Sequence, residues 1–225
     1  GASDLKSYYF SGGYYGKKTL VRFNMFSGKE ITYQSWYGVP ESRLNNDVPG
    51  MMATASDELW NAAQTQNLLS SNSRTFNPYL YKDQVDNYGQ YHYQLHVSQQ
   101  FSPALTANVS LHTTLGKGYY EEFKYDAAFS KYGLPSTIIG LDTIRSSDLV
   151  RRRWLDNYFY GFTYSVNYEK NKLTSILGGG WNTYSGDHFG EITWAAVAVN
   201  IPSGAFLKLW IGSLLFLLMV LHAEA

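Results

Sequence analysis

The sequence predicts an all-β fold, an antiparallel transmembrane β-barrel fragment built from hairpins. Three observations lead to this prediction. Apolar and polar residues alternate with period two along several segments, which is typical of strands with one buried face. Very short turns alternate with long connections, as in barrels that carry short turns on one side of a membrane and long loops on the other. The 225 residues include 20 Tyr, 12 Phe and 6 Trp, and aromatic residues form girdles where such a barrel meets the two membrane interfaces.

The first predicted hairpin lies near the start of the chain. One alternating run precedes a turn at residues 16–18 and a second run follows it. Arg22 and Asn24 are the polar residues of the second run. The alternation predicts two strands that share one apolar face, formed by Tyr8, Phe10, Gly12, Tyr14, Val21, Phe23 and Met25.

The second predicted hairpin turns at residues 102–104. Its apolar face comprises Tyr91, Tyr93, Leu95, Val97, Leu105, Ala107, Val109, Leu111 and Leu115. Its polar face comprises His92, Gln94, His96, Ser98, Thr106, Asn108, Ser110, His112 and Thr114. A hairpin centred near Pro103 puts His112 opposite Gln94 and diagonal to the other two histidines.

A third hairpin turns at residues 169–172. Its first strand is marked by Tyr158, Tyr160, Phe162, Tyr164, Val166 and Tyr168, and a Gly-rich strand follows over residues 173–184. These runs give about six strands, and each reaches or exceeds the roughly 9 to 11 residues that a tilted membrane strand needs. Aromatic residues near the strand ends, Tyr88, Tyr91, Phe101, Tyr119 and Tyr120, fit interfacial girdles.

The connections between the hairpins are long, over residues 27–87, 120–152 and onward from 185. Unstructured loops above about 12 to 15 residues are uncommon in compact soluble domains. Inside the first connection, residues 53–66 predict a short helix capped by Thr54 or Ser56. We expect Trp60 of this helix to pack the loop.

Composition excludes several classes of function. The formal net charge is zero, which removes the electrostatic case for nucleic acid. Cysteine is absent, so there is no disulfide framework and no thiolate nucleophile. The sequence carries no GxSxG, HExxH or phosphate-loop motif. We therefore expect no enzymatic activity, no cofactor and no metal.

Candidate binding residues fall into three groups. His92, Gln94, His96 and His112 share a polar face; we interpret them as the lining of a water-filled lumen, with a metal site as the alternative that lacks a carboxylate ligand. Arg151 and Arg152, followed by Arg153, form either a solvated cluster near lipid headgroups or a site for anionic ligands. Trp36, in the aromatic stretch at residues 26–44, contacts either a ligand or the girdle and neighbouring loops.

Several stretches in consistent order resemble one family over residues 5–195: FSGKEITYQSWYGVPESRL, YGQYHYQLHVSQQFS, LGKGYYEEFK, IRSSDLVRRRWLDNYFYG and LGGGWNTYSGDHFGEITWA. Together they resemble the barrel domain of TonB-dependent outer-membrane receptors of the Bacteroidetes type. The resemblance implies a 22-stranded barrel with a plug domain inside it. It also implies location in the bacterial outer membrane, and import of an iron chelate such as a siderophore, cobalamin or a glycan. The partners would be outer-membrane lipid, the extracellular ligand, and TonB through an N-terminal region outside this chain.

The chain departs from the family pattern in strand number, in the lack of a plug and coupling box, and in its tail. We therefore expect residues 1–195 to be a partial barrel domain, not transport-competent alone, and residues 196–225 to be an apolar segment outside the pattern. A frameshift near residue 195 is the favoured explanation of the tail, and a helical segment is the other. A soluble carbohydrate-binding β-sandwich is the alternative for the fold, since alternation also describes its strands.

Overall fold

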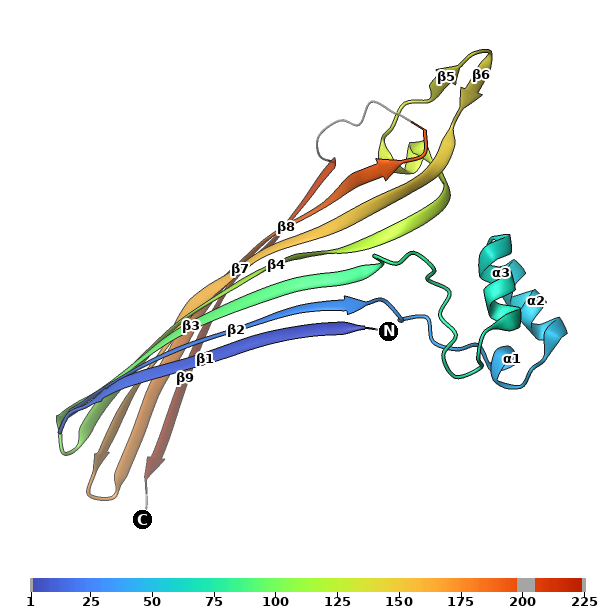
Figure 1. The fold of residues 1–225 in the computed structure, drawn as a ribbon. Coiled ribbons are helices and arrows are strands. Elements are labelled where there is room, and N and C mark those ends of the chain that lie inside the picture. The colour runs from blue at the N-terminus through green and yellow to red at the C-terminus, as the bar shows by residue number, and fades with distance from the viewer. Residues whose placement is uncertain (1, 198–204, 224–225) are drawn as a thin grey trace.

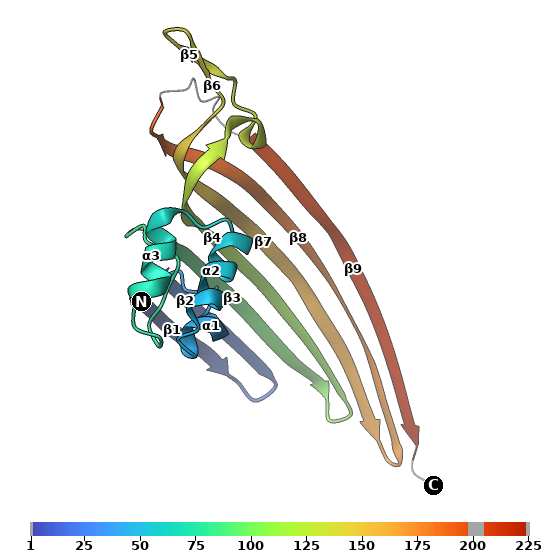
Figure 2. The same ribbon diagram turned by 90° about the vertical axis from the view of Figure 1, so that its right-hand side faces the viewer.

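The structure, a computed structural model, describes residues 2–197 and the backbone of residues 205–223. Within these ranges seven strands form one antiparallel sheet in the order β1-β2-β3-β4-β7-β8-β9, and β5 pairs with β6 in a separate small sheet. The long strands lie in a single curved layer with β1 and β9 at its two edges (Figures 1 and 2). The all-β class is therefore confirmed, as an open sheet.

The three predicted hairpins are confirmed. They are β1 (Ser3–Tyr15) with β2 (Thr19–Tyr33), β3 (Val85–Ser102) with β4 (Leu105–Ala128), and β7 (Ser146–Lys170) with β8 (Leu173–Ala195). Gln94 and His112 are Cα partners, as the turn position predicts. The short turns all lie at one end of the sheet and the long connections at the other (Figure 1).

The strands extend further toward the long connections than the alternation predicts. β4 continues to Ala128 and β7 begins at Ser146, where 120–152 had been expected as a link. The extension carries charged and aromatic residues on both faces, Glu121 and Glu122 opposite Arg152 and Arg151. Because neither face is apolar there, a period-two pattern cannot detect it.

The C-terminal tail continues the sheet. Residues Ala205–Ala223 form strand β9, which pairs with β8 from Leu173 to Gly190. The helical segment considered for this tail is wrong over these residues. The sequence of β9 is apolar at nearly every position. It therefore shows no period-two alternation, although its backbone is a strand. The frameshift hypothesis concerns the gene and stays a prediction.

The first long connection folds into three helices, α1 (Glu41–Leu44), α2 (Val48–Asp57) and α3 (Ala62–Ser70). The single helix predicted over residues 53–66 is wrong, as are its proposed caps. Asp47 caps α2 by accepting from the Gly50 amide at 3.1 Å, and Asn61 forms a capping box with Gln64 at the start of α3. Leu59, with φ of 55°, breaks the helical path between them.

The second long connection contains a short 3-10 helix (Phe129–Tyr132) and the small hairpin of β5 (Thr137–Ile139) and β6 (Asp142–Ile144). Buried apolar side chains gather at this end of the molecule. One cluster, inside the first connection, joins Met51, Ala55, Leu68 and Phe76; the others are Ala127, Phe129, Leu134, Leu149 and Val150. The middle of the sheet contributes none of the buried apolar residues identified in the described chain.

Candidate functional site

One face of the sheet is apolar across six strands, and we call it the apolar face. Strand pairing aligns its residues in rows, such as Phe23, Leu95, Leu111, Phe162 and Trp181. Its large side chains are exposed although they are neighbours: Tyr8, Phe10, Tyr14, Phe23, Tyr91, Val109, Leu111, Tyr158, Tyr160, Phe162, Val166 and Leu177. A patch of this extent on a protein surface marks an interaction with lipid or with a partner.

An aromatic row lies on the same face nearer the long connections. The rings of Tyr119 and Trp154 have centroids 4.7 Å apart, and Trp154 stacks on Phe189 at 5.9 Å. Trp154 Nε1 also donates to Glu191 Oε2 at 2.9 Å. This arrangement has the composition of an interfacial girdle. Of the residues predicted for a girdle, Tyr88 and Tyr120 instead belong to the opposite face, because each is one residue out of step with the apolar alternation.

The opposite, polar face carries the predicted lumen residues. His92 Nδ1 is 2.9 Å from Thr114 Oγ1, and His96 Nδ1 is 2.9 Å from Ser110 Oγ. Gln94 Oε1 accepts from Asn24 Nδ2 at 3.3 Å. The His112 ring packs beside Phe159, with centroids 5.0 Å apart. These four residues share a surface, but each histidine contacts a different neighbour. They therefore form a polar lining and do not converge as a set of metal ligands.

Two polar networks on this face were missed in the sequence. Arg22 Nε lies 3.2 Å from Asn24 Oδ1, which also accepts from Tyr9 and Ser11. The only sequence signal is a lone arginine in an alternating strand. Pairing across β1 and β2 is what brings Tyr9 and Ser11 beside it.

The second network centres on Asn157. Its Nδ2 donates to the Tyr88 hydroxyl at 3.2 Å, and its Oδ1 accepts from the Tyr184 hydroxyl at 2.6 Å. Tyr88 reaches Asn157 across the intervening strand β4, over the site of Gly116. The glycine makes this reach possible because a Cβ there would meet the Tyr88 ring.

The arginine block is engaged within the sheet. Arg152 Nε donates to Glu121 Oε2 at 2.7 Å, with the guanidinium 4.3 Å from the Tyr119 ring centroid. Arg151 Nε donates to Glu122 Oε2 at 2.8 Å. The two arginines, adjacent in sequence, point to opposite faces and do not form a joint anion site. Both guanidinium groups are therefore engaged with carboxylates of β4.

The carboxylates of these pairs are buried at the loop end of the sheet. Burial opposes ionisation of Glu122, but Lys124 and Arg151 together outweigh it and lower its pKa. Glu121 Oε1 accepts from the Tyr81 hydroxyl at 2.7 Å. Burial first, and this carboxylate second, raise the pKa of Tyr81. The first connection is thus attached to the sheet by a phenol that stays protonated at any physiological pH.

The aromatic stretch at residues 26–44 splits into three roles. The Tyr33 hydroxyl donates to the Tyr79 and Tyr81 carbonyls at 2.6 and 2.9 Å. Tyr37 packs edge-on against Trp60 at 5.1 Å, and burial followed by a hydrogen bond to Glu58 raises the pKa of Tyr37 to about 12. Trp36 is 59% exposed and meets Tyr120 edge-on at 5.7 Å. Trp36 therefore remains a candidate for ligand contact, whereas Trp60 packs the loop as expected.

The described residues contain no group of three or more His, Asp or Glu side chains arranged to hold a metal ion. None of their helices is long and apolar enough to cross a membrane.

Comparison with known proteins gives no assignment. No protein-family model matches the chain, and no curated protein is significantly similar to it.

Proposed function

We propose that the chain forms part of the wall of a TonB-dependent receptor in a bacterial outer membrane, which imports an iron chelate such as a siderophore, cobalamin or a glycan. The observation that carries the proposal is the uncovered apolar face. Full burial of one large apolar side chain is worth about 1.5 to 3 kcal/mol. Half of that value over the dozen exposed side chains comes to on the order of 10 kcal/mol, comparable with the whole stability of a domain. A lipid environment removes this penalty.

The composition of the polar face supports the proposal that this face lines the water-filled interior of the barrel. Its side chains are mostly uncharged and hydrogen-bonded to one another, as at His92, His96 and Asn24. Outward apolar and inward polar residues alternating along each strand are the pattern of outer-membrane barrels. An open edge such as β1 leaves backbone groups unpaired, which lipid does not tolerate. In the proposal, further strands of a longer protein complete the barrel.

A soluble sandwich receives less support from the same observation. A sandwich buries its apolar face beneath a second sheet. In the described part of the chain, the second sheet is the short β5–β6 hairpin, which lies at the loop end beyond the apolar face (Figures 1 and 2). The carbohydrate-binding sandwich is not retained as a second candidate.

Membrane fractionation tests the proposal with two matched variants. Leu111→Arg puts a charge on the apolar face, and Thr163→Arg puts the same charge on the polar face beside Gly180. A lipid-facing arginine near the midplane of a barrel costs about 2 to 4 kcal/mol. We expect Leu111→Arg to reduce the membrane-integrated fraction strongly and Thr163→Arg to leave it nearly unchanged. A wild-type chain that is monodisperse without detergent would sink the proposal.

The import role needs a separate measurement. A strain lacking the full-length gene is expected to lose uptake of one ligand class among siderophores, cobalamin and glycans, and to regain it on complementation. Unchanged uptake of all three classes would refute the transport role while leaving the membrane location standing.

A further inference from the structure

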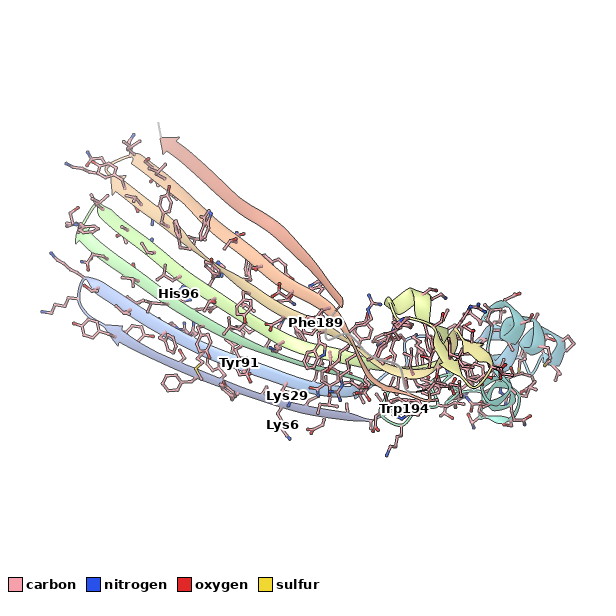
Figure 3. All side chains as sticks on the ribbon, turned by 90° about the horizontal axis from the view of Figure 1, so that it is seen from above. Lys6, Lys29, Tyr91, His96, Phe189 and Trp194 are labelled. Atoms are coloured by element: carbon pink, nitrogen blue, oxygen red, sulfur yellow. The ribbon has the colours of Figure 1, made fainter. Side chains whose placement is uncertain are left out.

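Two lysines face each other directly on neighbouring strands at the border of the apolar face. Lys6 on β1 and Lys29 on β2 are Cα partners and lie side by side (Figure 3). Like charges directly opposite on one face are unfavourable. Asp4 lies 3.3 Å from Lys6 Nζ, but both side chains are largely exposed, at 57% and 77%. Such an exposed pair contributes little and leaves this corner with excess positive charge.

Two residues along the strands from the lysines, toward the short turn, two tyrosines flank a small residue. Tyr8, Ser27 and Tyr91 occupy one row of β1, β2 and β3. Ser27 is buried while both tyrosines are more than 40% exposed. The two exposed tyrosines thus lie on either side of the small, buried Ser27 in this row. Tyr91 lies close to the lysines in the side-chain view (Figure 3).

Space is available beside Lys29. Gly89 on β3 is its Cα partner, and a Cβ built there would have its nearest neighbours at 3.9 Å. The lysine stems can lie along the apolar surface while their ammonium groups reach the polar border. Two lysines and two tyrosines in neighbouring rows of one face, next to an apolar band, match a lipid whose phosphate lies at the interface and whose chains cover the band.

We propose that Lys6, Lys29, Tyr8 and Tyr91 form a site for the phosphate group of an anionic membrane lipid. The proposal rests on the membrane location proposed above. It assigns the lipid contact to the lysine pair and not to the arginine block, whose Arg151 and Arg152 are already paired with Glu122 and Glu121.

The test uses the full chain and three vesicle compositions. They are phosphatidylcholine alone, phosphatidylcholine with phosphatidic acid, and phosphatidylcholine with oleic acid adjusted to the same surface charge. Retention of spin-labelled phosphatidic acid around the protein is measured for the wild type and two variants. Lys6→Gln/Lys29→Gln removes the site, and Lys17→Gln/Lys18→Gln removes the same charge from the turn at the far end of the hairpin.

The wild type is expected to retain phosphatidic acid in preference to oleic acid. Lys6→Gln/Lys29→Gln is expected to weaken this preference about tenfold, and Lys17→Gln/Lys18→Gln to leave it unchanged. The proposal is overturned by equal loss in both variants, by the absence of a preference, or by full competition from inorganic phosphate in solution, which would identify a free anion as the ligand. Failure to associate with any of the vesicles would refute the membrane location itself.

Discussion

Arg152 on β7 and Glu121 on β4 form a charge-assisted hydrogen bond, with Arg152 Nε 2.7 Å from Glu121 Oε2. The other carboxylate oxygen accepts from Tyr81 at 2.7 Å, and the Glu121 carbonyl accepts from Gln34 Nε2 at 3.1 Å. Gln34 is 1% exposed. Glu121 therefore links β4 and β7 to segments near both ends of the first long connection, which orders the loop end of the molecule.

Removing this arginine should loosen the loop end. Arg152→Gln leaves the buried Glu121 carboxylate without its cation, and a hydrogen bond to a charged group is worth about 1.5 to 3 kcal/mol. Since Arg152 is about one-third exposed, we expect a loss near the lower end of that range in thermal unfolding in detergent. Lys117→Gln is the control, because the Lys117–Asp156 pair is also 2.7 Å long but has a largely exposed lysine, so its loss should destabilise the fold less than the loss of Arg152. Equal losses would contradict this account.

Acid should weaken the same region through Glu122. The folded-state pKa of Glu122 is lowered by Lys124 and Arg151 despite burial, so its ionised form stabilises the fold at pH values above its unfolded pKa, about 4.3. This contribution is lost as the pH falls from there through the lowered folded value. Protection factors of the amides at the β4 and β7 loop ends, which correct for the intrinsic pH dependence of exchange, should fall over this window in the wild type. In Glu122→Gln these protection factors should already be lower at neutral pH and should fall less on acidification; an unchanged pH profile in the variant would rule out Glu122 as the source.

Three glycines of the polar face should differ sharply in their tolerance of alanine. Gly28 has open space where a Cβ would go, so Gly28→Ala should be close to neutral. In Gly116→Ala the new Cβ would displace the end of the Tyr88 side chain and its hydrogen bond to Asn157, at about 0.5 to 1.5 kcal/mol. In Gly118→Ala it would clash with the Asn87 carbonyl, which cannot swing away, so folding should fail or weaken most. Thermal unfolding of each variant in detergent measures this order, and a reversed order would refute the close approach of β3 and β4.

The helical connection should unfold independently of the sheet. Leu68 is fully buried in the cluster with Met51 and Phe76, and Leu→Ala in such a core costs about 2 to 5 kcal/mol. We expect Leu68→Ala to open residues 41–76 to limited proteolysis while the sheet stays intact. Leu59→Ala, at a position 90% exposed, should be cleaved no faster than the wild type. Cleavage spreading equally into the strands of Leu68→Ala would show that the two parts are coupled.

Hairpin registers could be predicted from the sequence because short turns fix them. The turn after Phe101 sets Gln94 opposite His112, and alternation then assigns the residues from Tyr91 to Val97 and from Leu105 to Leu115 to a face. The shared surface of His92, Gln94, His96 and His112 followed from this register. The hydrogen-bond and packing partners of these four side chains could not be predicted, because they depend on side-chain lengths and conformations across neighbouring strands.

Other features lay outside the reach of periodicity. β9 is apolar at nearly all positions, so it resembles a helix or a foreign segment by pattern alone. The ends of β4 and β7 are held by cross-strand ion pairs between residues some thirty positions apart, such as Arg152 and Glu121. One continuous helix was expected where Asn61 caps a second helix. The break could not be predicted, because a left-handed leucine such as Leu59 has no signature in the sequence.

The most direct test of the central claim is the accessibility of β4 in a lipid bilayer. The chain has no cysteine, so a single introduced thiol carries a unique spin label at each position from Asn108 to Thr114. Labels at Val109, Leu111 and Thr113 should collide preferentially with oxygen dissolved in the lipid, and labels at Asn108, Ser110, His112 and Thr114 with a water-soluble nickel complex. Loss of this alternation, or its inversion, would contradict the assignment of the apolar face to lipid.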